Sequence, residues 1–207
     1  MTKVNKTSLN PVLATIRDRR SVRLFTDQPV PEMDLLSILS AANRAPSAHN
    51  QQSWRFIVLR GGKKQALAEV VNNKAQDYPK PSCALLRMAS RTIVSAPVVV
   101  AVSNTGELIR HGTELFKVDK DAALDFFRTM EIQSSAAAVE NLLLAASSMG
   151  IGSVWLGVLF LIKHDILAFL EEPPDGEFMA VIPLGFPARV SDGPKKRPLA
   201  VSIRYLD

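Results

Sequence analysis

The sequence predicts an α+β protein, in which helices pack on the faces of one sheet. Helical patterns and short strand patterns follow one another in uneven order along the chain, which is typical of this class. The chain has 207 residues, of which 47% are hydrophobic and 22% charged, as in a folded globular protein rather than a disordered one. Residues 1–207 are therefore expected to form a single domain with a sizeable core.

The N-terminal half is divided by capping and breaking residues. Asn10 and Pro11 supply an N-cap and a favoured first helical residue. We expect a helix that ends at the basic residues 17–20, a second helix from residues 31–32 to Pro46, a strand over Trp54–Leu59, a third helix after the turn at Gly61-Gly62, and a loop over residues 72–82.

The C-terminal half contains the longest helical pattern of the chain. Residues 121–149 carry almost no charge after Ser134, which predicts a buried helix that stops at Gly150. Residues 104–120 mix glycine and charges without a clear period, which predicts a mobile excursion that could gate a site. The other expected elements are a short helix over residues 85–93, buried strands over 97–103 and 178–184, a short strand over 153–156, a helix over 165–170 and a strand-like tail over 199–206.

The net charge of +5 is modest and comes from short clusters, such as Lys63-Lys64 and Lys195–Arg197, rather than from a continuous basic stripe. Aromatic residues make up 6% of the chain and are not interleaved with these clusters, which argues against stacking on nucleic-acid bases. We therefore expect no nucleic-acid partner, and favour the phosphate of a small ligand.

Cysteine and histidine are too few and too scattered for a disulfide or a metal centre. The lone cysteine, Cys83, fits a reducing compartment, and the three histidines lack metal-ligand spacing. The longest apolar run, residues 96–102, is too short to span a bilayer, and the first six residues lack the apolar core of a signal peptide. We expect a cytoplasmic protein with no metal and no membrane contact, whose chemistry comes from a bound cofactor.

Residues 45–56 form a dense run of small and amide side chains, here called the amide loop, just before and into the predicted strand. Asn and Gln side chains each offer a donor and an acceptor, so their cluster at the start of a strand suits a planar ligand with N–H and C=O edges. A plain turn, with Pro46 stopping the helix and Asn50 capping the next element, is the alternative.

Two basic segments flank this loop in the sequence. Arg19, Ser21 and Arg23 occupy alternating positions of an extended segment, which would put all three on one side of it. Lys195 and Arg197 lie far downstream. A ligand with a phosphate at one end and a ring at the other would draw the two segments and the amide loop together.

With these segments the sequence resembles the FMN-dependent nitroreductase family over most of its length, from about residue 16 to residue 199. The order of the motifs, more than any one of them, carries the resemblance. In sequence order they are Arg19–Arg23, Asp27-Gln28-Pro29-Val30-Pro31, the amide loop, residues 133–141 on the long helix, residues 150–157, Leu184-Gly185-Phe186-Pro187 and residues 195–199.

The resemblance implies a three-layer sandwich, in which helices flank a central, mostly antiparallel sheet, with FMN as cofactor. The resemblance implies that Arg19, Ser21 and Arg23 contact the phosphate, ribityl chain and ring edge of FMN, and that Lys195 and Arg197 contact the phosphate. The loop that reaches the flavin across a homodimer interface would supply Pro46, Ser47, Asn50 and Gln52, and the backbone of Leu156 and Gly157 would face the reactive edge of the ring. Further candidates are Arg20, Gln133 and Arg91.

The resemblance also implies the reaction and the assembly. A homodimer with FMN at the subunit interface, and a C-terminal strand able to pair with the partner subunit, would transfer a hydride from NADH or NADPH through flavin N5 to a nitroaromatic, quinone or related electron-poor acceptor by a ping-pong mechanism. Other FMN chemistry on the same fold stays open, namely flavin fragmentation, reductive dehalogenation or deazaflavin-linked reduction. The choice between NADH and NADPH, and the role of His49, stay open as well.

Overall fold

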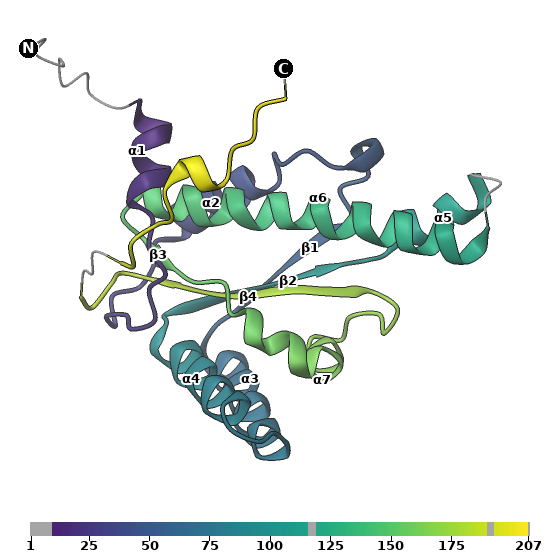
Figure 1. The fold of residues 1–207 in the computed structure, drawn as a ribbon. Helices are drawn as coiled ribbons and strands as arrows, with labels where there is room; N and C mark the ends of the chain where they lie inside the picture. Colours follow the sequence, from purple (N-terminus) through teal and green to yellow (C-terminus); the bar gives the residue numbers. More distant parts are fainter. Residues whose placement is uncertain (1–9, 116–118, 190–192, 207) are drawn as a thin grey trace, which may run out of the picture.

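The computed structural model describes residues 10–115, 119–189 and 193–206, and it has three layers (Figure 1). The predicted α+β sandwich is confirmed. The first six residues, where no signal peptide is expected, lie outside the described ranges. One face of the sheet carries helices α1 (Pro11–Asp18), α2 (Glu32–Ala42) and α6 (Lys120–Ser148), and the other carries α3 (Gly61–Lys74), α4 (Ser82–Ser95) and α7 (Lys163–Phe169).

The central sheet has the strand order β1-β2-β4-β3, and each neighbouring pair is antiparallel, as the resemblance implied. Strands β2 and β4 are buried along their whole length because helices cover both faces. Their sequences are therefore continuous apolar runs rather than alternating ones. The strands are β1 (Trp54–Leu59), β2 (Val98–Asn104), β3 (Gly152–Ser153) and β4 (Glu177–Gly185).

Strand β2 divides the core, because successive side chains of a strand point to opposite faces. Val98, Val100 and Val102 pack with apolar residues of α2 and α6, whereas Val99 and Ala101 pack with those of α3, α4 and α7. Both clusters contain side chains with no exposed surface. The sheet is thus a rigid platform, and its β3 edge is the place where the candidate site forms.

Two predicted loops contain helix. Within residues 72–82, helix α3 continues to Lys74 and a 3₁₀ turn follows, because buried Val71 and Ala75 hold the polar segment against the core. Within residues 104–120, the expected irregular excursion is helix α5 (Glu107–Leu115), which packs on the first turns of α6. Its contact is close, since a Cβ placed on Gly112 would lie 2.6 Å from the ring of Phe127.

Several element ends differ from the sequence expectation. The helix predicted to reach Pro46 stops at Ala42, where Asn43 closes the last turn. Strand β3 is shorter than predicted because the chain turns into a 3₁₀ helix at Gly157. The long helix and the strand at Trp54–Leu59 are confirmed. None of the helices in the described ranges combines the length and the apolar character needed to cross a bilayer.

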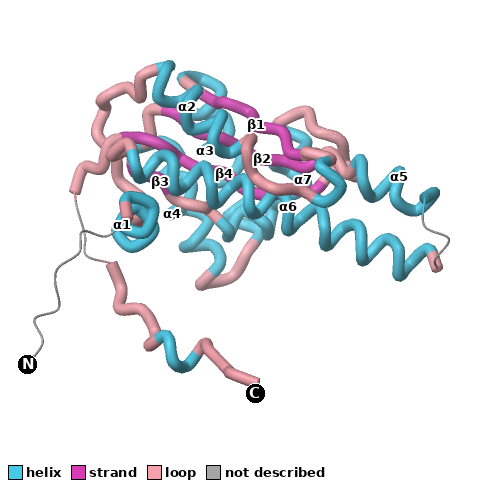
Figure 2. The backbone as a smooth tube through the Cα atoms, turned by 90° about the horizontal axis from the view of Figure 1, so that it is seen from above, coloured by secondary structure: helices cyan, strands magenta, loops and turns pink. Residues whose placement is uncertain are grey.

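The predicted C-terminal strand is not formed in the single chain. Residues 199–201 make a 3₁₀ turn, and residues 193–206 run outside the layers (Figures 1 and 2). Leu199 is 72% exposed, and Tyr205 is 81% exposed. An alternating segment becomes a strand only when it pairs with another, and nothing in the described chain pairs with this one. Pairing with a partner subunit stays a prediction.

Candidate functional site

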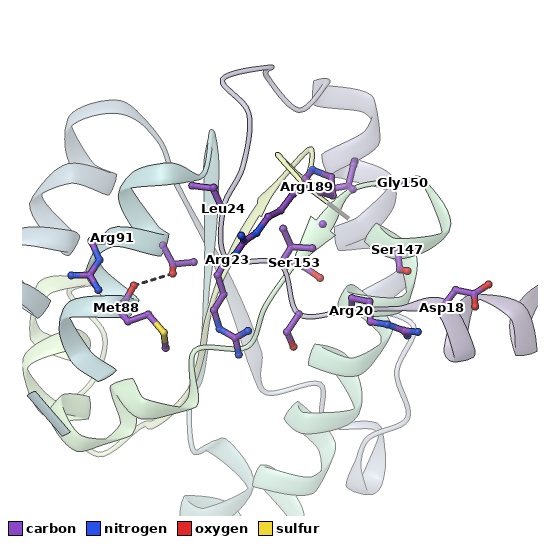
Figure 3. A pocket seen from close by; sticks show the side chains of 16 residues that line it. Asp18, Arg20, Arg23, Leu24, Met88, Arg91, Ser147, Gly150, Ser153 and Arg189 are labelled. Carbon is purple, nitrogen blue, oxygen red and sulfur yellow. Dashed lines mark hydrogen bonds between the residues drawn. The ribbon is translucent and has the colours of Figure 1, made fainter. Parts of the chain in front are cut away.

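A cavity of about 620 Å³ opens at the β3 edge of the sheet. Residues 18–24, here called the strap, form one wall, and α4 forms another. The turn that leads from α6 into β3 and the chain after β4 complete it. Figure 3 shows Arg23 and Arg189 near its centre, Asp18 and Arg20 at one end, and Met88 and Arg91 at the other. Segments far apart in the sequence therefore meet in one hollow.

The strap is held in place as an added edge of the sheet. The Val22 N–H donates to the Ser153 carbonyl at 2.9 Å, and Ser21 and Ser153 form a parallel bridge. Further along the strap, the Ala188 N–H donates to the Leu24 carbonyl at 3.0 Å. Backbone hydrogen bonds at two points thus fix the positions from which the strap's side chains reach the cavity.

Gly152 allows this close approach of the strap to β3. A Cβ placed on Gly152 would lie 2.8–3.0 Å from side-chain atoms of Val22, a separation that real Cβ atoms hardly show. Only glycine lets the strap lie this close to the sheet without a shift of one or the other. The predicted motif at residues 150–157 therefore has a packing role in the wall of the cavity.

The cavity is strongly basic. Among the described residues, the guanidinium groups of Arg20, Arg23, Arg91 and Arg189 line it, against one carboxylate, that of Asp18. That carboxylate is already paired, because Arg17 donates to its two oxygens at 2.7 and 2.8 Å. The hydrogen bond from Arg17 holds the pKa of Asp18 below its ordinary value. The surplus positive charge is therefore available to an anionic ligand.

Arg20 is held in position by its own backbone neighbourhood. Its Nη1 donates to the carbonyls of Arg17 and Arg19 at 2.7 and 2.8 Å, at the point where α1 ends. These bonds anchor the head group beside the last carbonyls of the helix. A guanidinium whose position is fixed in this way loses less freedom on binding a phosphate.

The structure divides the predicted residues of the N-terminal segment. Arg20, Ser21 and Arg23 line the cavity, but Arg19 does not. Arg19 instead faces α6, with its Nε 3.7 Å from the Glu140 carboxylate. The expected alternation puts Arg19, Ser21 and Arg23 on one side, and it fails at Arg19 because the chain turns there as it leaves α1.

The C-terminal basic segment begins beside the cavity and then leaves it. A Cβ placed on Gly193 would lie 2.8 Å from the side chain of Arg20, so this residue packs against the strap. Lys195 and Arg197 follow in an exposed stretch and are not among the residues that line the cavity. Arg189 does line it, although sequence reasoning missed it; its signal is a basic residue two positions after Pro187.

The amide loop lies outside this cavity and has a strained backbone. His49, Asn50 and Gln52 have φ of 53°, 55° and 54°, the left-handed region that non-glycine residues seldom adopt. The Gln52 side chain donates to the Asn50 carbonyl and side-chain oxygens, and the Gln52 N–H donates to the Ser47 hydroxyl at 3.1 Å. Clustered strain of this kind is typical of functional segments.

The remaining predicted contacts also lie outside the cavity. Gln133 is exposed on α6, and Pro46 is exposed in the amide loop. The N–H groups of Leu156 and Gly157 are already used, since they donate to the carbonyls of Val181 and Trp155 at 3.1 Å each. In this conformation neither N–H is free to face a ligand, in contrast to the expectation from the resemblance. Gly157 does have open space beside its Cα, because a Cβ placed there would meet no atom within 4 Å.

The structure is a three-layer α+β fold with a basic pocket of about 620 Å³ at its sheet edge, which suits a small anionic ligand such as a phosphorylated cofactor. The sequence model of the Nitroreductase family matches residues 16–186, and the chain belongs to this family. The resemblance found in the sequence is thereby confirmed, and with it the expected class of oxidoreductase.

The similar proteins support the assignment over nearly full length. A protein of Archaeoglobus fulgidus, named as an NADH dehydrogenase/NAD(P)H nitroreductase, is 30% identical over 184 residues, which cover 87% of each chain. The 5,6-dimethylbenzimidazole synthase of Rhodospirillum rubrum is 26% identical over 177 residues, covering 82% of this chain and 78% of its own. A Desulfovibrio desulfuricans nitroreductase solved in complex with FMN is 29% identical with a TM-score of 0.71, covering 96% of this chain and 98% of its own.

Proposed function

We propose that this chain is an FMN-dependent oxidoreductase that takes a hydride from NADH or NADPH and passes it to an electron-poor acceptor such as a nitroaromatic or a quinone. The observation that carries the proposal is the basic cavity, where four arginines gather from the strap, α4 and the chain after β4. The names of the similar proteins, which include NAD(P)H nitroreductases and an FMN complex, agree with it.

The residues present fit FMN in size and in chemistry. The cavity volume of about 620 Å³ falls in the range of small-ligand sites, roughly 300–1,000 Å³. Planar guanidinium forks suit the oxygens of a phosphate, and the hydroxyl of Ser21 suits a sugar-like chain. Apolar side chains such as Met88 and Ile151 offer contacts to a ring. We assign Arg20, Ser21, Arg23 and Arg91 to FMN binding, with Arg189 in addition.

When bound, FMN supplies the hydride chemistry, and the protein supplies binding, orientation and electrostatics. The fixed positive charges of the cavity hold the anionic cofactor and stabilise negative charge on it.

No second nucleotide-binding motif occurs in the sequence, so the nicotinamide and the acceptor use one site in turn. Double-reciprocal plots of the initial rate against NADH or NADPH concentration, recorded at several acceptor concentrations, should therefore run parallel, as a ping-pong mechanism requires. Intersecting plots would exclude a shared site.

We further propose a homodimer, in which the amide loop of one subunit completes the cavity of the other. In one chain the loop and the cavity are separate, although both carry residues that suit a flavin. Helix α1 has no buried residue, with Val12 63% exposed and Leu13 54% exposed. Together with the exposed apolar tail, this surface is suited to association with a second copy.

Sedimentation should accordingly show a dimer at low micromolar concentration. Replacement of Leu13 and Ile16 by glutamate should shift the protein toward monomer, because both side chains are about half exposed in one chain and would place charge in an apolar contact. The monomer should then also bind FMN more weakly. A wild-type protein that binds FMN fully as a monomer would contradict the shared site.

The C-terminal basic segment provides a separate prediction. If Lys195 and Arg197 clamp the phosphate once the dimer forms, the Lys195→Ala/Arg197→Ala variant should lose about 1.5–3 kcal/mol of FMN binding for each charged hydrogen bond removed. Fluorescence titration of FMN measures this directly. Unchanged affinity would remove the two residues from the site and leave the cavity arginines as the phosphate ligands.

Flavin fragmentation is a second candidate function, because one relative is named 5,6-dimethylbenzimidazole synthase. That product carries a dimethyl-substituted ring like that of a flavin. If this chemistry applies, reduced FMN exposed to oxygen on the protein should yield 5,6-dimethylbenzimidazole, which mass spectrometry detects. Under the first candidate, FMN is instead recovered unchanged after many turnovers.

A further inference from the structure

The core between α6 and the amide loop contains a carboxylate that the cavity does not use. Glu131, on α6, is 1% exposed. Its Oε1 accepts from the Ser53 hydroxyl at 2.9 Å and from the Leu108 N–H at 2.8 Å, and its Oε2 accepts from the Asn104 side-chain amide at 2.9 Å. Among the described residues, no lysine, arginine or histidine pairs with it.

These three donors come from three separate segments. Ser53 belongs to the amide loop, just before β1 begins. Asn104 is the last residue of β2, and Leu108 is the second residue of α5. One side chain thus fastens a loop, a strand end and a helix start to α6. A carboxylate in the core is costly unless its oxygens are satisfied, and here hydrogen bonds from three places satisfy it.

The residue type matters, because each side of the Glu131 carboxylate faces a group that can only donate. A glutamine would turn its NH₂ group toward the Leu108 N–H on one side or the Asn104 amide nitrogen on the other, and only the Ser53 hydroxyl could rotate to accept from it. Asn104 is itself fixed, as its amide also donates to Ser135 and its oxygen accepts from the Gly106 N–H. Only an acceptor on both sides fits this arrangement.

Two further bonds couple the amide loop to the same helices. The Gln51 side chain donates to the Glu107 carboxylate on α5 at 3.1 Å, and the Ala48 N–H donates to the Ser134 hydroxyl on α6 at 3.1 Å. The residues with positive φ, His49, Asn50 and Gln52, lie between the attached residues Ala48 and Ser53, and the attached Gln51 lies among them. Strain of this kind persists only where the surroundings hold it.

We propose that Glu131 is a positioning residue: its buried carboxylate holds the amide loop and α5 against α6 as one unit and thereby sets the loop in the geometry that contacts FMN. The contact with FMN rests on the proposed function. The fastening of the loop does not, because it follows from the hydrogen bonds alone. Glu131 does not line the cavity and acts through Ser53 and Leu108.

The test compares Glu131→Gln with Glu172→Gln. Glu172 is a matched control, since its side chain is 5% exposed and accepts from Ser103, the neighbour of Asn104, at 2.7 Å and from Arg55. Its partners Arg55 and Ser103 both lie outside residues 47–53, so loss of its carboxylate should affect stability without affecting that part of the amide loop. Hydrogen exchange of residues 47–53 and 107–110, and the Kd for FMN from flavin fluorescence, are measured for both dimeric proteins.

We expect Glu131→Gln to raise amide exchange in these two segments at least tenfold and the Kd for FMN about tenfold, while Glu172→Gln changes neither by more than twofold. Equal effects of the two variants, or unchanged exchange in Glu131→Gln, would overturn the proposal. If Glu131→Gln does not fold, Ser53→Ala removes only the loop's bond, and it should raise exchange at residues 47–53 alone; no rise there would also overturn it. If the wild-type protein does not bind FMN, the proposed function is wrong. The hydrogen-exchange result still tests whether Glu131 holds the amide loop.

Discussion

The Arg23→Ala/Arg91→Ala variant should bind FMN roughly a hundredfold to ten-thousandfold more weakly than the wild type. The two guanidinium groups come from different walls of the cavity, Arg23 from the strap near its centre and Arg91 from α4 at one end (Figure 3). Each charged hydrogen bond lost costs about 1.5–3 kcal/mol, and each 1.4 kcal/mol is about tenfold in affinity. Both side chains are largely exposed in the single chain, so the fold should tolerate their loss.

A charge control separates this effect from the general attraction of an anion to a basic protein. The variant Arg60→Ala/Lys63→Ala also removes two positive charges, but from exposed residues at the start of α3. Neither residue lines the cavity. Its Kd for FMN, measured by the same titration, should change less than threefold at moderate salt, where exposed charges at a distance are screened. Equal losses in the two double variants would mean that the cavity arginines do not contact the cofactor.

The second large effect is expected from one added methyl group. Gly152→Ala should destabilise the protein by about 1–3 kcal/mol, because the new Cβ would overlap the side chain of Val22 and force the strap away from β3. Since the strap carries Arg20, Ser21 and Arg23, the Kd for FMN should rise at least tenfold. Urea unfolding measures the first quantity, and flavin fluorescence measures the second.

Gly62→Ala is the matched control for this substitution. A Cβ on Gly62 meets nothing within 4 Å, and the residue lies in the first turn of α3. The change should be neutral or should stabilise the helix by about 0.4–1 kcal/mol, with no effect on FMN. If Gly152→Ala behaves like Gly62→Ala, the close packing of strap and sheet is not what positions the arginines.

Much of the fold could be predicted from local sequence signals. Asn10 and Pro11 mark the start of α1, and the Asn10 side chain does accept from the Val12 N–H. The strand at Trp54–Leu59 has the predicted limits, because the glycine pair Gly61-Gly62 follows one residue after it. Such signals act within a few residues, so the sequence alone is enough to read them.

The wrong structural predictions concern segments whose conformation depends on contacts with distant parts of the chain. Helix α5 is amphipathic, but it is short and lies within a segment of mixed glycine and charges. Its position depends on Leu108 packing beside Phe127 of α6 and on the Glu131 carboxylate at its first turn. The tail from Leu199 alternates like a strand, but a strand needs a partner, and the single chain supplies none among the described residues.

The candidate site shows the same division. The composition of the strap predicted a phosphate ligand, and the structure places Arg20 and Arg23 in one cavity. Which of two adjacent arginines enters it could not be predicted, because the turn after α1 sends Arg19 to Glu140 and leaves Arg20 at the cavity. Arg189 was missed because only the folded sheet brings it beside the strap.

The most direct test of the proposed function is an anaerobic titration of the FMN-loaded protein with NADH and, separately, with NADPH. We expect the protein to take up about one FMN per chain, and at least one of the two nucleotides to bleach the oxidised flavin absorbance. Addition of a nitroaromatic or a quinone should then restore it. A protein that takes up no FMN, or a bound flavin that neither nucleotide bleaches, would contradict the account.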